Sequence, residues 1–301
     1  MEHITYDVVI VGGSYAGLSA AMTLGRSVRN VLVIDNRQPC NKTAPQAHNL
    51  ITHDGETPAA IAAKAREQLA LYKTVELIVD NVTAIVQNEG YFEVTTGNAR
   101  TVEAKKILFA TGIKDIMPDI PGFADCWGIS VIHCPYCHGY EVYGQKLAVF
   151  GNGDEGFEYA KLITNWSKDI TLFTNGTSTL SAEQLQQLQK HHINIVETKI
   201  EGINHNNGHV QNIALANANS YPVDAIFSRV PFEQHTQIPQ QLGCIIDAAG
   251  RIEVDGFGAT SVSGVYAAGD NSSPMRGLAN AMATGLMAGV IINKTLIDEE
   301  F

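Results

Sequence analysis

Two cysteines flanked by histidines are the residues of this chain best suited to chemistry. They lie in the stretch HCPYCHGYE, which runs from His133 to Glu141. Two residues separate Cys134 from Cys137, and His138 follows the second cysteine directly. Such a group can bind a metal, close a static disulfide or exchange electrons, and each use makes different demands on the rest of the chain.

Metal binding and a static disulfide both fit this stretch poorly. Structural zinc usually takes two spaced pairs of ligands, and no second pair accompanies Cys134 and Cys137 in the sequence. A disulfide across so small a loop removes little entropy from the unfolded chain, so it would stabilise the fold only slightly. We therefore expect no metal, and we favour redox exchange.

Redox exchange needs two neighbouring thiols, one of which ionises readily. A C-x-x-C pair that opens a helix meets this need, because the positive helix end lowers the pKa of a thiol. His138 can move protons, since imidazole titrates near neutral pH. The predicted catalytic residues are therefore Cys134, Cys137 and His138. Glu141 could orient His138, although an exposed surface glutamate is its more ordinary role, and His133 is expected to be packed or solvated.

A glycine-rich turn near the N-terminus predicts a site for a dinucleotide. The apolar run 8–11 is typical of a buried parallel strand, and Gly12 and Gly13 then force a tight turn. The helix that follows offers free N–H groups and a positive dipole end to a pyrophosphate. The next strand ends at Asp35, where such a fold places a carboxylate on the adenosine ribose. Ser14 replaces the middle glycine of the usual pattern, and it is small enough to keep the backbone accessible.

The same pattern returns in QKLAVFGNGDEGFEYAKLI, which is followed by the apolar run DITLFT. Its candidate nicotinamide-nucleotide residues are Gly151, Gly153, Asp154 and Gly156, with NADPH or NADH left open. Two such units in one chain indicate two cofactors that must meet. The sequence therefore predicts an α/β protein with two dinucleotide-binding, Rossmann-like domains of the three-layer ββα type. Between them, short alternating runs from Val75 to Val102 predict antiparallel strands.

The composition sets limits on the class of protein. The chain has 301 residues, 45% of them hydrophobic and 17% charged, which suits about two globular domains. The net charge of −11 argues against nucleic acid and anionic membranes as partners. The N-terminus runs straight into a strand without a secretory signal, so we expect a cytoplasmic location. The remaining cysteines are expected to be buried, inert thiols: Cys40, Cys126 and Cys244.

Four motifs in order give the chain a resemblance to a known family. They are GGSYAG near the start, ATG at 110–112, the C-x-x-C before the second glycine loop, and AAGD at 267–270. Over nearly its whole length the chain resembles the low-molecular-weight thioredoxin reductases. The resemblance implies an FAD domain at residues 1–113 and 243–301. It also implies an inserted second domain at 114–242 that carries the cysteines, and a homodimer.

The resemblance also implies roles for individual residues. Those that would contact FAD are Gly12, Gly13, Ser14, Tyr15, Ala16, Gly17, Asp35, Asn49, Val82, Ala110, Thr111, Gly112, Gly269, Asp270, Arg276, Gly277 and Leu278. Asp270 would hold the ribityl chain, while Arg276 and the helix after it would stabilise negative charge on the flavin. Cys137 would face the flavin, Cys134 would meet the substrate sulfur, and His138 would replace the acid of the family.

The source and destination of the electrons stay open. CPYCHGYE and PCNKTAPQAHNLITHDG are similar to motifs of gliotoxin-type dithiol oxidases and their bacterial relatives. The HRRxxxR segment that grips NADPH in thioredoxin reductases is absent from Phe173 to Ser181, which removes about 3–6 kcal/mol of binding. Arg229 could compensate from a later loop. The partner is then a thioredoxin-like protein or a small dithiol or disulfide.

Four functions remain on this reading. The first is a disulfide reductase with a weak nicotinamide site, and the second is a dithiol oxidase that uses oxygen. The third is a reductase with a non-nicotinamide donor such as ferredoxin. The fourth, a flavin-binding sensor without turnover, is disfavoured by the intact C-x-x-C pair.

Overall fold

The computed structural model describes residues 5–301, which fold into two compact units. Of the described residues, the first unit contains 5–42, 58–114 and 232–301, and the second contains 43–57 and 115–231. The compact units change at 114/115 and at 231/232. The predicted domain boundaries at 113/114 and 242/243 stay predictions. Within residues 5–301, no helix is long and apolar enough to cross a membrane.

A seven-stranded sheet forms the core of the first unit, with the order β3-β2-β1-β6-β5-β4 and β17 paired to β6. Its strands are β1 (Thr5–Val11), β2 (Val31–Asp35), β3 (Val75–Val79), β4 (Val82–Gln87), β5 (Phe92–Thr96), β6 (Thr101–Phe109) and β17 (Val265–Ala267). Strands β1, β2, β3, β6 and β17 pair in parallel, and β1 and β2 are rich in valine and isoleucine because both of their faces are buried. Strands β4 and β5 continue the sheet in antiparallel fashion from β6.

The antiparallel prediction for Val75–Val102 is wrong for β3, which pairs in parallel with β2 from Val75 onward. Strand β3 forms the edge of the sheet, and its residues are only partly buried or exposed. Alternation of apolar and polar residues reports this half-burial and carries no information about strand direction.

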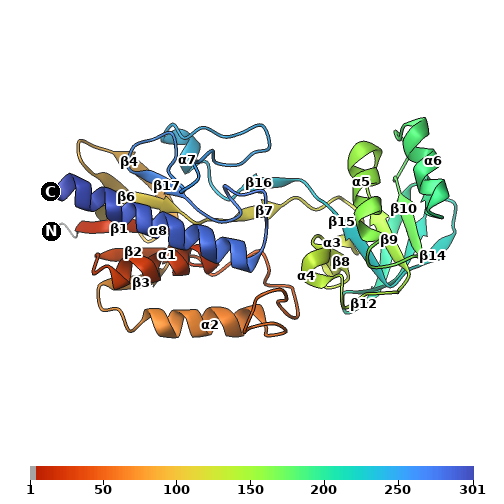
Figure 1. Cartoon of the computed structure of the whole chain (residues 1–301), viewed down its shortest axis with the longest axis horizontal. Coiled ribbons are helices and arrows are strands. Elements are labelled where there is room, and N and C mark those ends of the chain that lie inside the picture. Colours follow the sequence, from red (N-terminus) through yellow and green to blue (C-terminus); the bar gives the residue numbers. More distant parts are fainter. Residues whose placement is uncertain (1–4) are drawn as a thin grey trace. The chain divides into compact units, whose positions relative to one another are not determined.

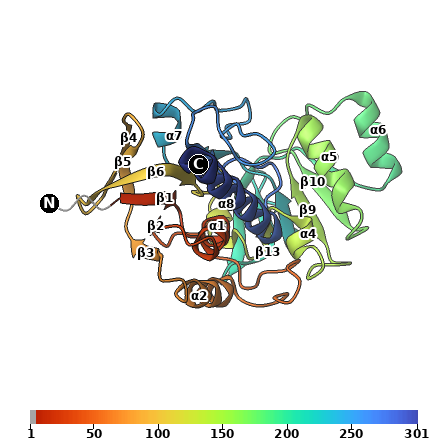
Figure 2. The ribbon, with the colours of Figure 1, turned by 60° about the vertical axis from the view of Figure 1, so that its left-hand side comes forward.

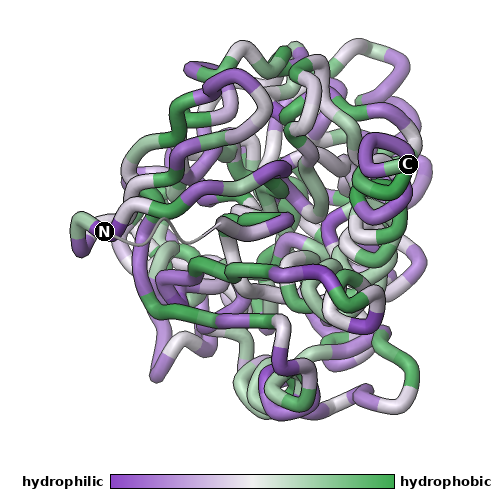
Figure 3. The backbone as a smooth tube through the Cα atoms, turned by 90° about the vertical axis from the view of Figure 1, so that its left-hand side faces the viewer, coloured by the Kyte–Doolittle hydropathy of each residue, from purple (hydrophilic) through white to green (hydrophobic). Residues whose placement is uncertain are grey.

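Helices α1 (Tyr15–Arg26) and α8 (Leu278–Glu300) run side by side in the first unit, as Figures 1 and 2 show. Small residues allow the close approach: a Cβ on Gly285 would lie 2.1 Å from the carbonyl oxygen of Ala16. The unit also contains α2 (Pro58–Leu69) and the short α7 (Ile238–Gln241). Apolar stretches recur along the helix that ends at the C-terminus in Figure 3, and its buried face includes Ala288 and Ile292.

The second unit is built on a five-stranded parallel sheet with the order β11-β10-β9-β15-β8. The strands are β8 (Val131–Ile132), β9 (Leu147–Phe150), β10 (Ile170–Phe173), β11 (Asn194–Val196) and β15 (Ala225–Ser228). The same unit contains helices α5 (Gly153–Ile163) and α6 (Ala182–Lys190), together with the short α3 (Phe123–Cys126) and α4 (Pro135–His138). A three-stranded antiparallel sheet completes the unit, with β12 (Ile200–Asn206), β13 (His209–Leu215) and β14 (Ser220–Pro222).

A two-stranded sheet forms where the chain leaves and re-enters the first unit, with β7 (Ile113–Asp115) paired to β16 (Phe232–Gln234). The predicted α/β class with two Rossmann-like sheets is confirmed by the two parallel sheets. In each unit a glycine loop joins the first strand of the Rossmann-like pattern to its helix, β1 to α1 and β9 to α5.

Candidate redox and nucleotide sites

Cys134 and Cys137 form a disulfide, with their Cα atoms 5.3 Å apart. Strand β8 leads into the motif, Cys134 is the N-cap of α4, and Pro135 occupies the first helical position, where its missing N–H does no harm. The prediction that the pair opens a helix is confirmed, but α4 spans only four residues. Because so short a helix sums few peptide dipoles, it lowers the pKa of a thiol less than a helix of ordinary length would.

The His138 imidazole lies at the end of α4 and is half-buried. Burial lowers the pKa of His138 below its ordinary value, the electrostatic influence of His48 lowers it further, and Glu141 acts in the opposite direction. The neutral imidazole is therefore favoured at neutral pH, and a neutral imidazole can accept a proton. The rings of His138 and His48 lie edge to face, with centroids 5.9 Å apart.

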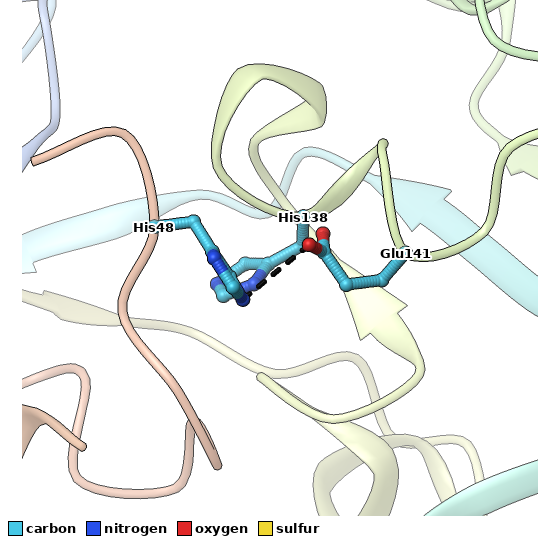
Figure 4. A group of neighbouring side chains, drawn as sticks. All are labelled: His48, His138 and Glu141. Carbon is cyan, nitrogen blue, oxygen red and sulfur yellow. Dashed lines mark ion pairs between the residues drawn. The ribbon is translucent and has the colours of Figure 1, made fainter. Parts of the chain in front are cut away.

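His48 comes from the segment 43–57, which packs in the second unit although it precedes α2 in the chain. Its Nε2 atom lies 3.4 Å from Oε1 of Glu141, and its Nδ1 atom lies 3.5 Å from Oδ2 of Asp54. Asp54 is held in turn, since its Oδ1 accepts a hydrogen bond of 2.7 Å from the backbone N–H of Asn49. Figure 4 shows His48 reaching from its loop toward His138 and Glu141, which come from the redox motif.

A cleft of about 360 Å³ opens beside the disulfide. Its lining combines the redox motif with the 43–57 loop and one more aromatic residue: His48, Asn49, Asp54, Pro135, Tyr136, Cys137, Tyr140, Glu141 and Trp166. Tyr136 and Tyr140 are 65% and 84% exposed, and Tyr136 meets the Trp166 ring edge to face at 5.4 Å. The volume is at the lower end of the usual range for ligand pockets.

The first glycine loop has the form that the ADP part of FAD requires. Gly12 has a φ of 104°, and a Cβ there would lie 2.3 Å from the Ala110 carbonyl oxygen. A Cβ on Gly17 would lie 1.9 Å from the carbonyl oxygen of Gly12, so the helix meets the turn at a distance that only glycine permits. Asp35 ends β2 next to Gly13 with 9% of its surface exposed. Ser14, the N-cap of α1, makes no capping hydrogen bond with its side chain among the described residues.

The other predicted FAD residues of the first unit lie mainly at the carboxyl ends of neighbouring parallel strands. Ala110, Thr111 and Gly112 follow β6, while Gly269 and Asp270 follow β17, which pairs with β6. Arg276 approaches Asp270, with its Nε atom 3.6 Å from Oδ2, and both side chains are largely buried. The remaining members lie on or near helices and on β4: Tyr15 and Ala16 in α1, Gly277 and Leu278 at the start of α8, and Val82 in β4.

One orphaned polar atom also favours a ligand at this edge. Asn271 is fully buried and donates to the Phe109 carbonyl and the Thr111 hydroxyl, but its Oδ1 atom has no hydrogen-bond partner within the described chain. A buried acceptor without a partner costs about 1–3 kcal/mol, which a bound group with a donor can recover. The residues present therefore fit FAD. Asn49 is the exception, since it lies in the second unit beside Cys137.

The second glycine loop is closed by its own side chains. Asn152 is the N-cap of α5, and its Oδ1 atom accepts hydrogen bonds from the backbone N–H groups of Gly153 and Thr179. Its Nδ2 atom donates to the carbonyl of Thr177. Asp154 lies in the first turn of α5 and accepts from Gln184 of α6. The Gly153 N–H, one of the donors that could bind a pyrophosphate, is thus already used, and the first turn is acidic.

The glycines of this second loop serve the packing of the fold. A Cβ on Gly156 would lie 2.7 Å from the carbonyl carbon of Gly151, and one on Gly151 would lie 3.0 Å from Cα of Gly156. Gly153 has a φ of 56°, a backbone conformation that favours glycine. These requirements exist whether or not a nucleotide binds.

The segment after β10, which would hold a 2′-phosphate, faces a carboxylate instead. Glu197 accepts a hydrogen bond of 2.6 Å from the backbone N–H of Ser178. Arg229, the residue that could have compensated, places its guanidinium carbon 4.8 Å above the ring of Tyr159. The Tyr159 hydroxyl donates to the carbonyl of His133, so this arginine is engaged beside the redox motif.

His48 and Asp54 are the residues of the site that sequence reasoning missed. They lie in the stretch PCNKTAPQAHNLITHDG, which carried the subgroup resemblance, but no spacing pattern links a loop histidine to a residue as distant as His138. Among the isolated cysteines, Cys126 and Cys244 are buried as predicted, and burial raises the pKa of both thiols. Cys40 is exposed, so the prediction of a buried thiol is wrong there.

Comparison with known proteins agrees with this arrangement. Residues 6–285 match the profile of a family described as pyridine nucleotide-disulphide oxidoreductase. The thioredoxin reductase tcpT of Claviceps purpurea is 30% identical over 305 residues, which cover 97% of this chain and 94% of that protein. The crystal structure of an oxidoreductase from Agrobacterium tumefaciens has a TM-score of 0.92 and 32% identity, covering 98% of this chain and 99% of the other. The thioredoxin reductase of Streptococcus pyogenes has a TM-score of 0.90 at 25% identity, with 100% of both chains covered.

Proposed function

Since the chain belongs to the pyridine nucleotide-disulphide oxidoreductase family and is a thioredoxin reductase-like enzyme, we propose that it passes electrons between FAD and a sulfur substrate through Cys134 and Cys137. The observation that carries this proposal is the disulfide between these cysteines, with His138 on the same helical turn. Family membership implies FAD, which, when bound, supplies a two-electron carrier. The substrate is a thioredoxin-like protein or a small molecule with two thiols or a disulfide.

The exchange step balances as an ordinary thiol–disulfide reaction. In the oxidising direction, a substrate thiolate attacks Sγ of Cys134, breaks the bond to Cys137 and leaves Cys137 as a thiolate. The second substrate thiol then attacks the mixed disulfide, which releases the oxidised substrate and leaves two electrons on the cysteine pair. The reverse order reduces a substrate disulfide. Cys137 lines the cleft beside the motif, and the family resemblance assigns it as the sulfur on the flavin side.

Substitution of each cysteine tests these roles. Cys134→Ser is expected to lose turnover but keep the long-wavelength absorption that a thiolate beside an oxidised flavin produces. Cys137→Ser is expected to lose both, because no sulfur then faces the ring. Anaerobic titration with a reductant, followed by absorption spectroscopy, distinguishes the two variants. If the band survives in Cys137→Ser and vanishes in Cys134→Ser, the two roles are reversed.

His138 carries the protons of this exchange. Its largely neutral imidazole accepts a proton from the incoming substrate thiol and returns one to a leaving thiolate. His138→Ala should therefore slow dithiol–disulfide exchange by about 10²- to 10⁴-fold, while FAD stays bound. His205→Ala is a matched control, since His205 pairs with Asp125 in the same unit. Equal exchange rates in the two variants would make His138 a structural residue.

A second candidate function, oxidation of a dithiol with oxygen as the final acceptor, is favoured by the second glycine loop. The Asn152 cap uses the Gly153 N–H, and the Glu197 carboxylate binds the Ser178 N–H and adds a negative charge that disfavours NADPH, so a substrate dithiol is the favoured source of electrons. Oxygen would take two electrons and two protons to become hydrogen peroxide. The similarity of CPYCHGYE to gliotoxin-type dithiol oxidases supports the same direction. A low-potential protein donor such as ferredoxin is the alternative, and measurement of peroxide during dithiol oxidation separates the two.

A further inference from the structure

We propose that His48, His138 and Glu141 form a binding site for a divalent transition metal of the zinc type, and that a metal bound there inhibits disulfide exchange. One ligand atom from each of the three residues lies within 4.8 Å of the others. Two of them come from the redox motif and the third comes from the 43–57 loop, as Figure 4 shows. The group is different from the cysteine–histidine set considered from the sequence, since both cysteines are engaged in the disulfide.

The distances suit zinc without refolding of the chain. Zinc binds nitrogen and oxygen ligands at about 2.0–2.2 Å in a tetrahedral arrangement, so its ligand atoms lie roughly 3.4 Å from one another. Nε2 of His48 and Oε1 of Glu141 already lie 3.4 Å apart. The third ligand, His138, lies on the single-turn helix α4 and completes the set with a displacement on the order of 1 Å, which side-chain rotation can supply.

Asp54 supports His48 in the manner usual for a metal-binding histidine. A ligating imidazole normally donates its second N–H to a carboxylate, which fixes the tautomer and the ring orientation. Nδ1 of His48 lies 3.5 Å from Oδ2 of Asp54, so Nε2 is left to face Glu141. Asp54 is itself fixed by the backbone N–H of Asn49. This outer carboxylate is an observation independent of the three ligands, and it points to the same use.

The ligand types select the metal. Two imidazoles and one carboxylate suit zinc, and a set of three protein ligands leaves the fourth position to water. The adjoining cleft of about 360 Å³, which both His48 and Glu141 line, gives a metal ion and its water access to the site. Zinc therefore binds as a reversible occupant next to the disulfide.

The consequence for catalysis rests on the proposed function of His138. A nitrogen lone pair that is bound to a metal cannot accept a proton, so metal binding removes the proton carrier from the exchange reaction. The metal site itself does not depend on that role, because binding can be measured without turnover. The metal site and the proton-transfer role of His138 can therefore be tested, and rejected, independently of each other.

Zinc binding to the oxidised holoenzyme tests the site directly. Isothermal titration with ZnCl₂ should be performed on chelator-treated protein with the disulfide closed, in a Cys40→Ser background that removes the exposed thiol. We expect one zinc ion per chain at this site, lost in His48→Ala and in Glu141→Ala. Asp54→Asn should weaken binding by about 10- to 100-fold, the usual effect of removing an outer-shell partner. His205→Ala, which removes a histidine–carboxylate pair without a third ligand, should bind zinc as the parent does.

Crystals soaked in zinc and measured at the zinc absorption edge locate the ion. An anomalous peak among the three ligands supports the proposal. Inhibition of exchange by zinc also supports it, provided that a chelator reverses the inhibition and that zinc slows His48→Ala less than the parent, each compared with its own rate without zinc. Equal zinc affinity in the parent, His48→Ala and Glu141→Ala would overturn the site, as would a peak elsewhere. Binding without inhibition would retain the site and remove its regulatory effect.

Discussion

The two glycine loops of this chain share the first and last glycines of the pattern, with Ser14 in the middle position of the first and Gly153 in that of the second, and they differ further in the residues around them. In the first loop, the Ser14 side chain leaves the start of α1 without a side-chain cap among residues 5–301, and α1 has no acidic residue in its first turn. In the second, the Asn152 side chain caps α5, and Asp154 and Glu155 occupy the first turn. The glycines are thus required by the close approach of strand and helix, while the residues beside them determine whether an anion can bind at the helix N-terminus.

The comparison explains why a glycine pattern alone is a weak predictor of a nucleotide. Gly17 and Gly156 occupy equivalent places, and a Cβ on either would lie less than 3.0 Å from backbone atoms of the preceding turn. The fold therefore retains both glycines for packing. The first loop combines them with a helix start that has no side-chain cap among the described residues and with a buried acid, Asp35, at the end of the next strand. The proposed assignment of FAD to the first loop and of a degenerate nicotinamide site to the second follows from this difference.

The largest expected effect is the loss of FAD when a side chain is added to the last glycine of the first loop. Gly17→Val should abolish FAD binding, because its Cβ would collide with the carbonyl oxygen of Gly12 and displace the start of α1. The measurement is the flavin content of purified protein, determined after denaturation. Gly156→Val should destabilise the second unit but leave the flavin in place. Gly256→Ala is the control, since a Cβ there meets open space. Full flavin content in Gly17→Val would show that the first loop does not bind FAD.

The choice of electron donor gives the next largest effect. Without the paired arginines, NADPH should bind about 10²- to 10⁴-fold more weakly than an ordinary 2′-phosphate site would bind it, and with little advantage over NADH. Anaerobic stopped-flow reduction of the flavin by NADPH, NADH, a dithiol and reduced ferredoxin measures this. We expect slow reduction by both nicotinamides and faster reduction by a dithiol or the protein donor. Rapid, saturable reduction at micromolar NADPH, with strong preference over NADH, would contradict this prediction and show that the protein acts as an ordinary NADPH-dependent thioredoxin reductase.

A feature can be predicted from the sequence when the residues that form it are close together along the chain. The Rossmann-like units, the helix that C-x-x-C opens and the place of Asp35 at a strand end follow from local patterns, and the structure agrees with them. The direction of β3 could not be obtained in this way, because alternation encodes burial rather than pairing. The approach of His48 to His138 is beyond local reasoning as well, since it arises from packing of the 43–57 loop in the second unit.

The capping of the second loop by Asn152 does not follow from the sequence, although the sequence does predict a weak nicotinamide site. The absence of arginines between Phe173 and Ser181 is visible from the letters alone. That Asn152 would turn its side chain onto Thr179, and that Glu197 would meet Ser178, depends on how β10, β11 and the loops after them lie in the sheet. These contacts provide a second, independent reason for a degenerate site.

The smallest expected effect is a partial restoration of the second loop. Thr177 is exposed and lies beside Ser178, so Thr177→Arg combined with Glu197→Gln would add a guanidinium and remove a negative charge where a 2′-phosphate would lie. One charge-assisted contact at an exposed position should raise the preference for NADPH over NADH by about tenfold, or about 1.4 kcal/mol. The measurement is the ratio of flavin reduction rates at subsaturating NADPH and NADH. Gln211→Arg adds one positive charge to the exposed side of β13, half of the net change in the double variant, and should leave the ratio unchanged. An unchanged ratio in the double variant would mean that Asn152 excludes the nucleotide before its 2′-phosphate is read, and a rise in both variants would mean that net charge, rather than the loop, limits binding.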